Sequence, residues 1–190
     1  GKPIIYIGVG QEYGDLQPLW IWDQLPGLTR AEGLVSQERR EFVGGMGDGA
    51  SGLTAMDYKR FTEGKAVEVR KLWAFHGDAV LCLLGGWETT GPVGDITTSI
   101  EQCRLRGPVE QPDKARWILH GGFGYLALGD ASLEVRRRRA TGSWNDINRR
   151  HDPREITEEV LHVDLCHGSD PRPAGFAIVL GANRKRIEGL

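Results

Sequence analysis

Apolar and polar residues alternate along the chain in many short runs, and helical periodicity is almost absent. Glycine, proline and small polar residues separate the runs, which is typical of strands joined by turns. Extended structure is predicted over residues 2–9, 53–58, 66–76, 79–84, 96–105, 116–120, 123–128, 132–138, 161–166 and 175–180. About ten strands without a helix of note predict an all-β fold, either an antiparallel sandwich or a stacked pair of sheets.

The run at residues 79–84 differs from the others because it is apolar on both faces. An uninterrupted apolar strand of this kind predicts that a layer covers each of its sides. The run at residues 66–76 is apolar at its odd positions, where Lys71 is the interruption, and partly polar at its even positions. We therefore expect the second run to have one apolar face and one partly wet face.

Glycines mark several of the predicted turns, and the chain has 27 of them. Gly121-Gly122 lies between two apolar runs and predicts a two-residue hairpin turn. The glycine-rich residues 44–49 lack the Lys-Ser/Thr pair and the following helix of a phosphate-binding loop. We interpret this stretch as a wide bend.

The most distinctive stretch contains Trp20 and Trp22, with Pro26-Gly27 shortly after them. In an extended segment these two indoles point to the same side, which predicts one flat aromatic face. Pro26 fixes φ and Gly27 can adopt positive φ, so the pair predicts a chain reversal. A flat aromatic face beside a turn is a surface on which sugar rings stack. The alternative is that both tryptophans fill a core.

Length and charge limit the class of protein. The 190 residues predict a single domain over residues 1–190. A net charge of −2 predicts no attraction to nucleic acid or to an acidic membrane surface. No apolar run approaches the roughly 20 residues that span a bilayer. The chain begins with Gly1 and has no signal peptide, so we expect a piece of a longer protein.

Cysteines and histidines form no motif that identifies a metal site, and no cofactor is predicted. Cys82, Cys103 and Cys166 are far apart and lack CxxC pairing. Cys82 is expected to be a small buried hydrophobe, whereas the other two are free thiols or a disulfide. No two histidines have the spacing of a zinc-binding helix, so hydrogen-bonded or exposed side chains are expected. The histidines are His76, His120, His151, His162 and His167.

Residues 136–139 are four consecutive arginines. In a strand, alternate side chains point to opposite faces, so at most two of them line one groove. Guanidinium groups match carboxylates and sulfates, which makes contact with a polyanion one interpretation. A solvated edge strand that resists aggregation is the favoured one.

Six short blocks follow one another along nearly the whole chain. They are residues 10–29 with the Pro-Gly-x-Thr motif, residues 42–45 with Gly52 and residues 56–58, the basic-aromatic residues 70–75, the Thr-Thr-x-x-x-Gln residues 97–102, the Gly-x-Trp-x-x-Ile-Asn residues 142–148, and His167-Gly168 with Pro171. Together they resemble the polysaccharide lyases of family eight, which are hyaluronate, chondroitin and xanthan lyases. Ile21 departs from the pattern, because the family often has an acidic residue between the two aromatics.

The resemblance implies an antiparallel β-supersandwich of the galactose-mutarotase-like type, within an enzyme that also has an α/α toroid and a C-terminal β domain. It implies β-elimination at a uronic acid, with an acidic polysaccharide as substrate and the toroid as partner. The family's catalytic residues lie outside the matched region, so no catalytic residue is assigned and the isolated chain is predicted to be inactive. Trp20 and Trp22 are the expected substrate-binding residues. The location implied is secreted or periplasmic.

Two other classes of function remain open at this point. A non-catalytic carbohydrate-binding or structural β-sandwich would use the tryptophans without any lyase chemistry. A metal-dependent hydrolase would use the histidines.

Overall fold

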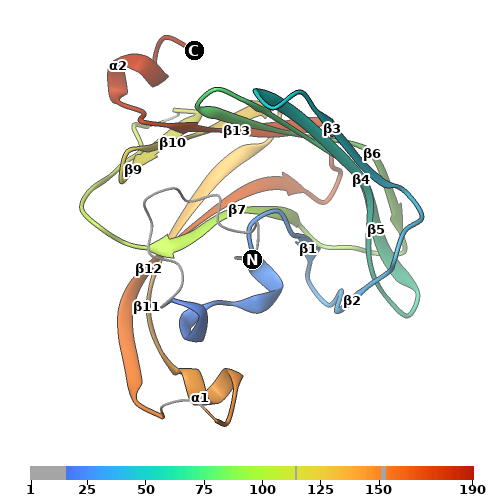
Figure 1. Cartoon of the computed structure of the whole chain (residues 1–190). Helices are drawn as coiled ribbons and strands as arrows, with labels where there is room; N and C mark the ends of the chain where they lie inside the picture. Colours follow the sequence, from blue (N-terminus) through green and yellow to red (C-terminus); the bar gives the residue numbers. More distant parts are fainter. Residues whose placement is uncertain (1–15, 114, 151–152) are drawn as a thin grey trace.

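Two antiparallel β-sheets face each other in the computed structural model, which describes residues 16–113, 115–150 and 153–190 (Figure 1). Thirteen strands lie in this part of the chain, so the prediction of an all-β antiparallel sandwich is confirmed. The strand predicted over residues 2–9 lies outside the described residues.

The larger sheet has nine strands in the order β2-β4-β5-β6-β13-β10-β9-β8, and β3 also pairs with β4. All of its pairings are antiparallel. Its strands are β2 (Ser36–Gln37), β3 (Val43–Gly47), β4 (Ser51–Thr62), β5 (Lys65–His76), β6 (Ala79–Thr90), β8 (Val109–Glu110), β9 (Trp117–His120), β10 (Phe123–Gly129) and β13 (Ala174–Leu180).

The smaller sheet has four strands in the order β1-β7-β12-β11, so the arginine-rich strand β11 lies at its edge as predicted. Its strands are β1 (Thr29–Ala31), β7 (Ile96–Arg104), β11 (Ser132–Ser143) and β12 (Glu155–Gly168). Helical turns are short in the described chain: the 3₁₀ helices η2 (Gln17–Leu19) and η3 (Trp22–Gln24), and the α-helices α1 (Trp144–Ile147) and α2 (Arg184–Ile187).

The main core fills the space between the two sheets. Cys82 and Phe176 of the larger sheet are buried together with Leu161 and Val163 of the smaller one. Cys82 is therefore the small buried hydrophobe that was predicted. All three cysteines are free thiols.

Of two turns predicted from the sequence, the structure confirms one and contradicts the other. Gly121-Gly122 joins β9 to β10 with φ of 58° and 83°, so the predicted hairpin turn is confirmed. The wide bend predicted for residues 44–49 is wrong, because residues 43–47 pair with β4 as a regular strand. Asp48 makes this possible, since its side chain accepts hydrogen bonds from the amides of residues 50 and 51 and closes a tight turn.

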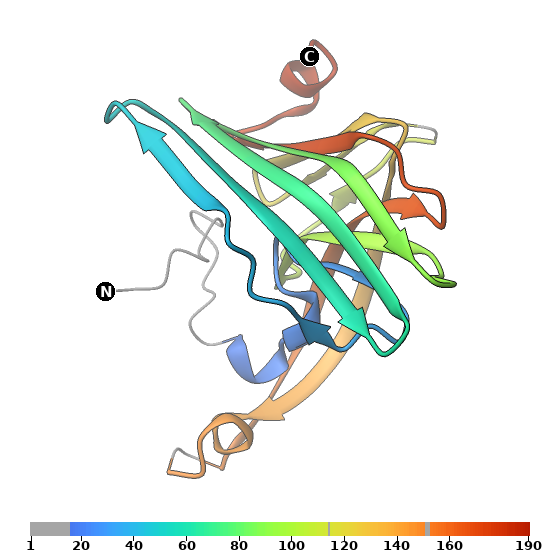
Figure 2. The same ribbon diagram turned by 90° about the vertical axis from the view of Figure 1, so that its right-hand side faces the viewer.

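Strand β6 also corrects an expectation. Its inward residues are buried: Val80, Cys82 and Leu84. On the opposite face, Leu81 is half-buried and Leu83 is 43% exposed. Figure 2 looks onto this side of β3–β6, and no layer of the described chain covers it. We call it the outer face. The second covering layer predicted for residues 79–84 is thus absent from the described residues.

None of the helices in the described ranges has the length and apolar content needed to span a membrane.

Candidate functional site

Residues 16–28, which we call the tryptophan segment, pack on the smaller sheet and lead into β1. Leu16 and Leu19 are buried against Ala140 of β11 and Val160 of β12 in a second core. This apolar contact fixes the start of the segment on the face of the smaller sheet that is turned away from the main core.

A glycine on β11 allows the close approach of the segment. A Cβ atom at Gly142 would collide with the carbonyl oxygen of Pro18. Only glycine fits at that position without a backbone shift. The Gly-x-Trp block of the sequence therefore begins at the residue against which the segment packs.

The two tryptophans have different environments. Trp20 is half-buried and packs against both cores, whereas Trp22 is 51% exposed. Their ring centroids lie 5.6 Å apart with an interplanar angle of 68°. The predicted flat face shared by both indoles is therefore wrong, because η3 begins at Trp22 and turns its ring edge-to-face with Trp20. Trp22 alone presents a large exposed ring.

Side chains of the smaller sheet hold the backbone of the segment. Gln102 accepts a hydrogen bond from the amide of Ile21 at 2.7 Å and donates to its carbonyl at 3.4 Å. Arg138 donates to the carbonyl of Leu19 at 2.5 Å, and Arg136 donates to the Gln24 side chain at 3.0 Å. Two of the four consecutive arginines thus line one face, as predicted, and they hold the segment.

The predicted Pro-Gly reversal is confirmed. The amide of Leu28 donates to the carbonyl of Leu25 at 3.0 Å, and Gly27 has φ of 88°. The amide of Gly27 donates to the carbonyl of Ser99 on β7 at 2.7 Å. The ammonium of Lys71 on β5 donates to the Gly27 carbonyl, also at 2.7 Å. Both sheets therefore bind this turn.

Lys71 is buried in the main core, with a relative exposure of 2%. Its Nζ lies 3.8 Å from the centroid of the Tyr58 ring, and the Tyr58 hydroxyl donates to the Thr29 carbonyl at 2.8 Å. Burial lowers the pKa of Lys71 to about 7. The lysine that interrupts the apolar face of residues 66–76 is thus an inward-facing donor that binds the turn.

A short polar chain continues from the turn into the smaller sheet. The hydroxyls of Thr29 and Thr98 are 2.8 Å apart, and Thr98 is 2.9 Å from Nε2 of His167. Burial, and to a smaller extent the charge of Lys71, lowers the pKa of His167 to about 4. His167 is therefore a neutral hydrogen-bonding residue at neutral pH.

Two arginines share one buried carboxylate beneath the segment. Arg30 contacts both oxygens of Asp164 at 3.2 Å, and Arg136 contacts Oδ2 at 2.5 Å. Burial on its own would raise the pKa of Asp164, but the hydrogen bonds and charges of the two guanidiniums hold it below its ordinary value. One carboxylate for two guanidiniums leaves a positive charge here. The side chain of Arg136 is 37% exposed, so this positive charge is accessible to an anion.

A hollow of about 550 Å³ adjoins the segment. Arg60 is buried at its wall and donates to the carbonyls of Leu34 and Asp23 at 2.7 and 3.3 Å. Three carboxylates on its lining are exposed: Asp23, Glu32 and Asp95. The hollow suits hydroxyl-rich groups better than anions, because its cations are engaged and its exposed charges are negative.

The six sequence blocks thus meet around one segment, which was not apparent from their spacing. Lys71, Gln102 and Gly142 contact the segment directly. Tyr58 binds the carbonyl of Thr29, the residue that follows the segment, and His167 is linked to Thr29 through Thr98. In the second block, residues 42–45 lie elsewhere, in and just before β3, and Gly52 lies on β4 opposite Gly47. Sequence reasoning missed Lys71 and Gln102 as holding residues. Lys71 gave a signal, because a lysine on an apolar strand face needs a partner.

Catalytic groups are not evident at this site. Tyr58 and Tyr125 are buried, and burial raises the pKa of both phenols, so neither reaches a substrate as a base. Tyr6, Tyr13 and His151 lie outside the described residues. Within the ranges that the structure covers, no group of three or more His, Cys, Asp and Glu side chains can hold a metal ion.

Comparisons with known proteins agree with the sequence blocks. Residues 2–188 match the family described as polysaccharide lyase family 8, super-sandwich domain. Chondroitinase-AC of Pedobacter heparinus is 29% identical over 196 residues, covering 90% of this chain and 27% of that protein. Xanthan lyase of Bacillus sp. is 24% identical over 163 residues, covering 72% and 17%. The chain therefore spans about a quarter or less of these curated relatives.

Solved structures give the same result. The chondroitin AC lyase of Streptomyces coelicolor A3, in complex with chondroitin sulphate, has a TM-score of 0.76 at 28% identity, over 93% of this chain and 25% of that chain. A Paenibacillus xanthan lyase has a TM-score of 0.75 at 19% identity, over 96% and 20%, which shows the shared fold. Because the family match extends over residues 2–188, the chain belongs to polysaccharide lyase family 8, where it corresponds to the super-sandwich domain.

Proposed function

We propose that this chain is the β-sandwich part of a polysaccharide lyase that cleaves a uronic-acid-containing polysaccharide of the hyaluronan, chondroitin or xanthan type. Residues 1–190 form one domain that serves as scaffold and as one wall of the substrate cleft, and an α/α toroid supplies the other wall. The enzyme is secreted or periplasmic, since a polysaccharide of this kind is met outside the cytoplasmic membrane. Family membership and the names of the relatives support this proposal.

The reaction is β-elimination at the uronic acid. The carboxylate is neutralised, a base removes the proton from C5, and the electron pair forms a double bond to C4 as the oxygen on C4 leaves. Since that proton is weakly acidic, the site has to stabilise the developing enolate as well as position the base. No residue of this chain is assigned either role.

The observation that carries the proposal is the exposed ring of Trp22 on a backbone held by both sheets. Holding a contact residue rigidly lowers the entropy lost when a flexible glycan binds. Arg136 lies in the same region and adds a partly exposed guanidinium that complements an anionic glycan. Trp22 and, through edge-to-face support, Trp20 are the proposed substrate-binding residues.

A chimaera tests the scaffold role. This chain would replace the matched part of Pedobacter heparinus chondroitinase-AC, and product formation would be followed by the ultraviolet absorbance of the unsaturated uronide. We expect the folded chimaera to form product from an acidic polysaccharide and the isolated chain to form none. A folded but inactive chimaera would contradict the scaffold role, and turnover by the isolated chain would contradict the absence of a catalytic group.

The non-catalytic alternative makes a different prediction. A carbohydrate-binding module would bind glycan tightly without any other domain, and it would not restore activity in the chimaera. Titration of the isolated chain with chondroitin, hyaluronan and xanthan fragments therefore separates the two functions.

A further inference from the structure

The hollow beside the tryptophan segment, of about 550 Å³, has walls from both sheets. Strands β1 and β7 of the smaller sheet form one side, where Arg30 lies opposite Thr97 in the antiparallel register. Arg60 of β4 reaches the hollow from the larger sheet and donates to the carbonyls of Leu34 and Asp23. Because Arg60 is only 8% exposed, its guanidinium fixes these two walls and is not free to bind a ligand. A site held in this way is preformed, which lowers the entropy lost on binding.

Carboxylates dominate the accessible polar groups of this hollow. Three of them are exposed on its lining: Asp23, Glu32 and Asp95. Asp23 lies 3.9 Å from Arg60, whereas Glu32 and Asp95 have no ion pair with another described residue. Arg30, the other cation of the lining, is held by Asp164 at 3.2 Å. Since an ionised carboxylate only accepts hydrogen bonds, a ligand of this hollow has to donate them.

The ligand that fits these groups is a neutral sugar. The carboxylates come from η3, from the loop after β1 and from the residue before β7. Among the described residues, no three His, Cys, Asp and Glu side chains come together to hold a metal ion. Sugar hydroxyl groups are donors that separate carboxylates can bind, and Val35, 74% exposed on the lining, offers an apolar contact to the ring. The volume lies within the range of sites for small ligands.

A positively charged surface adjoins the hollow. Gln24 lines the hollow and also accepts a hydrogen bond from Arg136 at 3.0 Å. The guanidinium of Arg136 is partly exposed, so two surfaces of opposite charge meet at Gln24. A polysaccharide that alternates a uronic acid with a neutral sugar carries its charge in the same alternation. Its uronate can therefore contact Arg136 while the neighbouring neutral ring lies in the hollow.

We propose that the hollow is a subsite for the neutral sugar of an acidic polysaccharide, and that its carboxylates discriminate against a sulphate ester on that sugar. A sulphate group has only acceptor oxygens, so it forms no hydrogen bond with Glu32 or Asp95 and is repelled by their charge. The enzyme should therefore prefer an unsulphated polysaccharide to a sulphated one with the same backbone. This inference rests on the proposed function, because it assumes that a glycan contacts Trp22 and Arg136.

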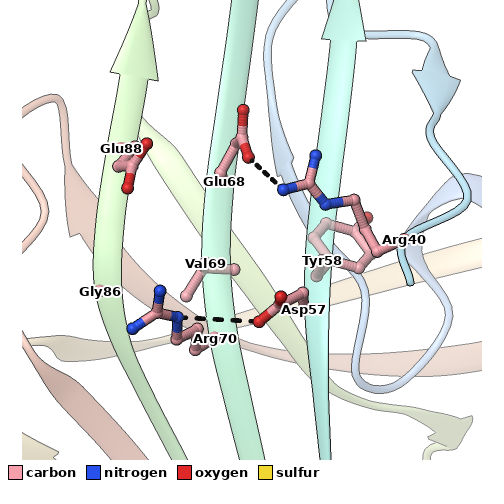
Figure 3. A pocket seen from close by; sticks show the side chains of 8 residues that line it. All are labelled: Arg40, Asp57, Tyr58, Glu68, Val69, Arg70, Gly86 and Glu88. Carbon is pink, nitrogen blue, oxygen red and sulfur yellow. Dashed lines mark ion pairs between the residues drawn. The ribbon is translucent and has the colours of Figure 1, made fainter. Parts of the chain in front are cut away.

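A second hollow, on the outer face of β4–β6, lacks these properties (Figure 3). Arg40 pairs with Glu68 at 2.9 Å, and Arg70 lies 3.7 Å from Asp57. The volume of about 80 Å³ holds a few water molecules rather than a sugar ring. Glu88 lies on the lining of this second hollow and is exposed. Glu88 is therefore a suitable control, since it is an exposed carboxylate where no glycan is expected to bind.

The chimaera with Pedobacter heparinus chondroitinase-AC tests the proposal on two substrates of one backbone, chondroitin and chondroitin sulphate, whose sulphate groups lie on the neutral sugar. The readout is the ratio of kcat/KM for chondroitin to kcat/KM for chondroitin sulphate. Glu32→Gln combined with Asp95→Asn should lower this ratio about tenfold, because the amides keep the size of the side chains and can donate to sulphate. Glu88→Gln should leave the ratio unchanged.

An unchanged ratio in the double variant, or an equal change in Glu88→Gln, would overturn the proposal. Failure of the proposed lyase function has a different signature, which is a folded chimaera that turns over neither substrate. In that case, titration with oligosaccharides of the two substrates gives the same preference as a ratio of dissociation constants. A lower ratio in the double variant alone would then still support the subsite, and equal ratios would overturn it.

Discussion

At the scale of single residues, Lys71 is the least expected feature of the core. A buried ammonium usually has a carboxylate partner, whereas Lys71 has the Gly27 carbonyl and the face of Tyr58. Lys71 therefore positions the turn at Gly27, and its buried charge lowers the stability of the folded protein. Its contact joins the larger sheet to the turn that follows Trp22.

Lys71→Met should raise the free energy of unfolding and remove a pH dependence. The pKa of Lys71 is about 7 in the folded protein and near 10.5 when the chain is unfolded, so the unfolded state binds more protons between these values. The free energy of unfolding of wild type should therefore rise as pH increases from 7 to 10. Below pH 7 the contribution of Lys71 to it should be constant. We expect a gain of about 1–3 kcal/mol at pH 7 for the variant. Urea unfolding across this pH range measures both effects.

A variant that is less stable than wild type at pH 7 would show that the hydrogen bond to Gly27 outweighs the burial of charge. An unchanged slope between pH 7 and 10 would show that Lys71 does not titrate in this window.

At the scale of elements, the tryptophan segment shows what sequence patterns can and cannot predict. Alternation predicted most strands, because one buried face per strand leaves a period of two in the sequence. The turn at Pro26-Gly27 was predictable from backbone chemistry alone. The 3₁₀ helix at Trp22 was not, because it depends on residues far away in sequence: Gln102 binds the Ile21 amide and Arg136 binds the Gln24 side chain. Local sequence patterns cannot predict contacts between residues that are far apart in the chain.

Gln102→Leu should loosen the segment without unfolding the sandwich. The change removes the partner of the Ile21 amide and leaves a partly buried donor unpaired, which costs about 1–3 kcal/mol. We expect a lower midpoint of urea unfolding and faster amide exchange at Ile21. Gln111→Leu is the matched control, since Gln111 is exposed and far from the segment. Equal exchange rates in both variants would contradict the holding role of Gln102.

At the scale of the whole molecule, two histidines of β12 make the stability depend on pH: His162 is buried and His167 is half-buried. Burial, followed by the charge of Arg136, lowers the pKa of His162 to about 4, and the pKa of His167 is similarly low. Both side chains are neutral in the folded protein near pH 6. Unfolding exposes them to water, where they bind protons more readily.

Stability should therefore fall as pH decreases from 6.5 to 4, because the unfolded state binds more protons over this range. We expect a loss of about 2 kcal/mol for each of the two histidines, measured as urea midpoints at pH 4.5 and 7.5. His162→Gln should make this loss smaller. His76→Gln is the control, because His76 is exposed and bonded only to Ser51 among the described residues. An equal effect of the two variants would contradict the assignment to buried histidine.

The central claim is that the fold presents Trp22 to a glycan on a rigidly held segment. Its most direct test is the affinity of the chimaera described above for chondroitin sulphate oligosaccharides, measured by titration for Trp22→Ala and for the matched exposed control Ile147→Ala, which is 41% exposed in wild type. We predict at least a tenfold loss of affinity for Trp22→Ala and none for the control. Unchanged affinity in Trp22→Ala would contradict the claim.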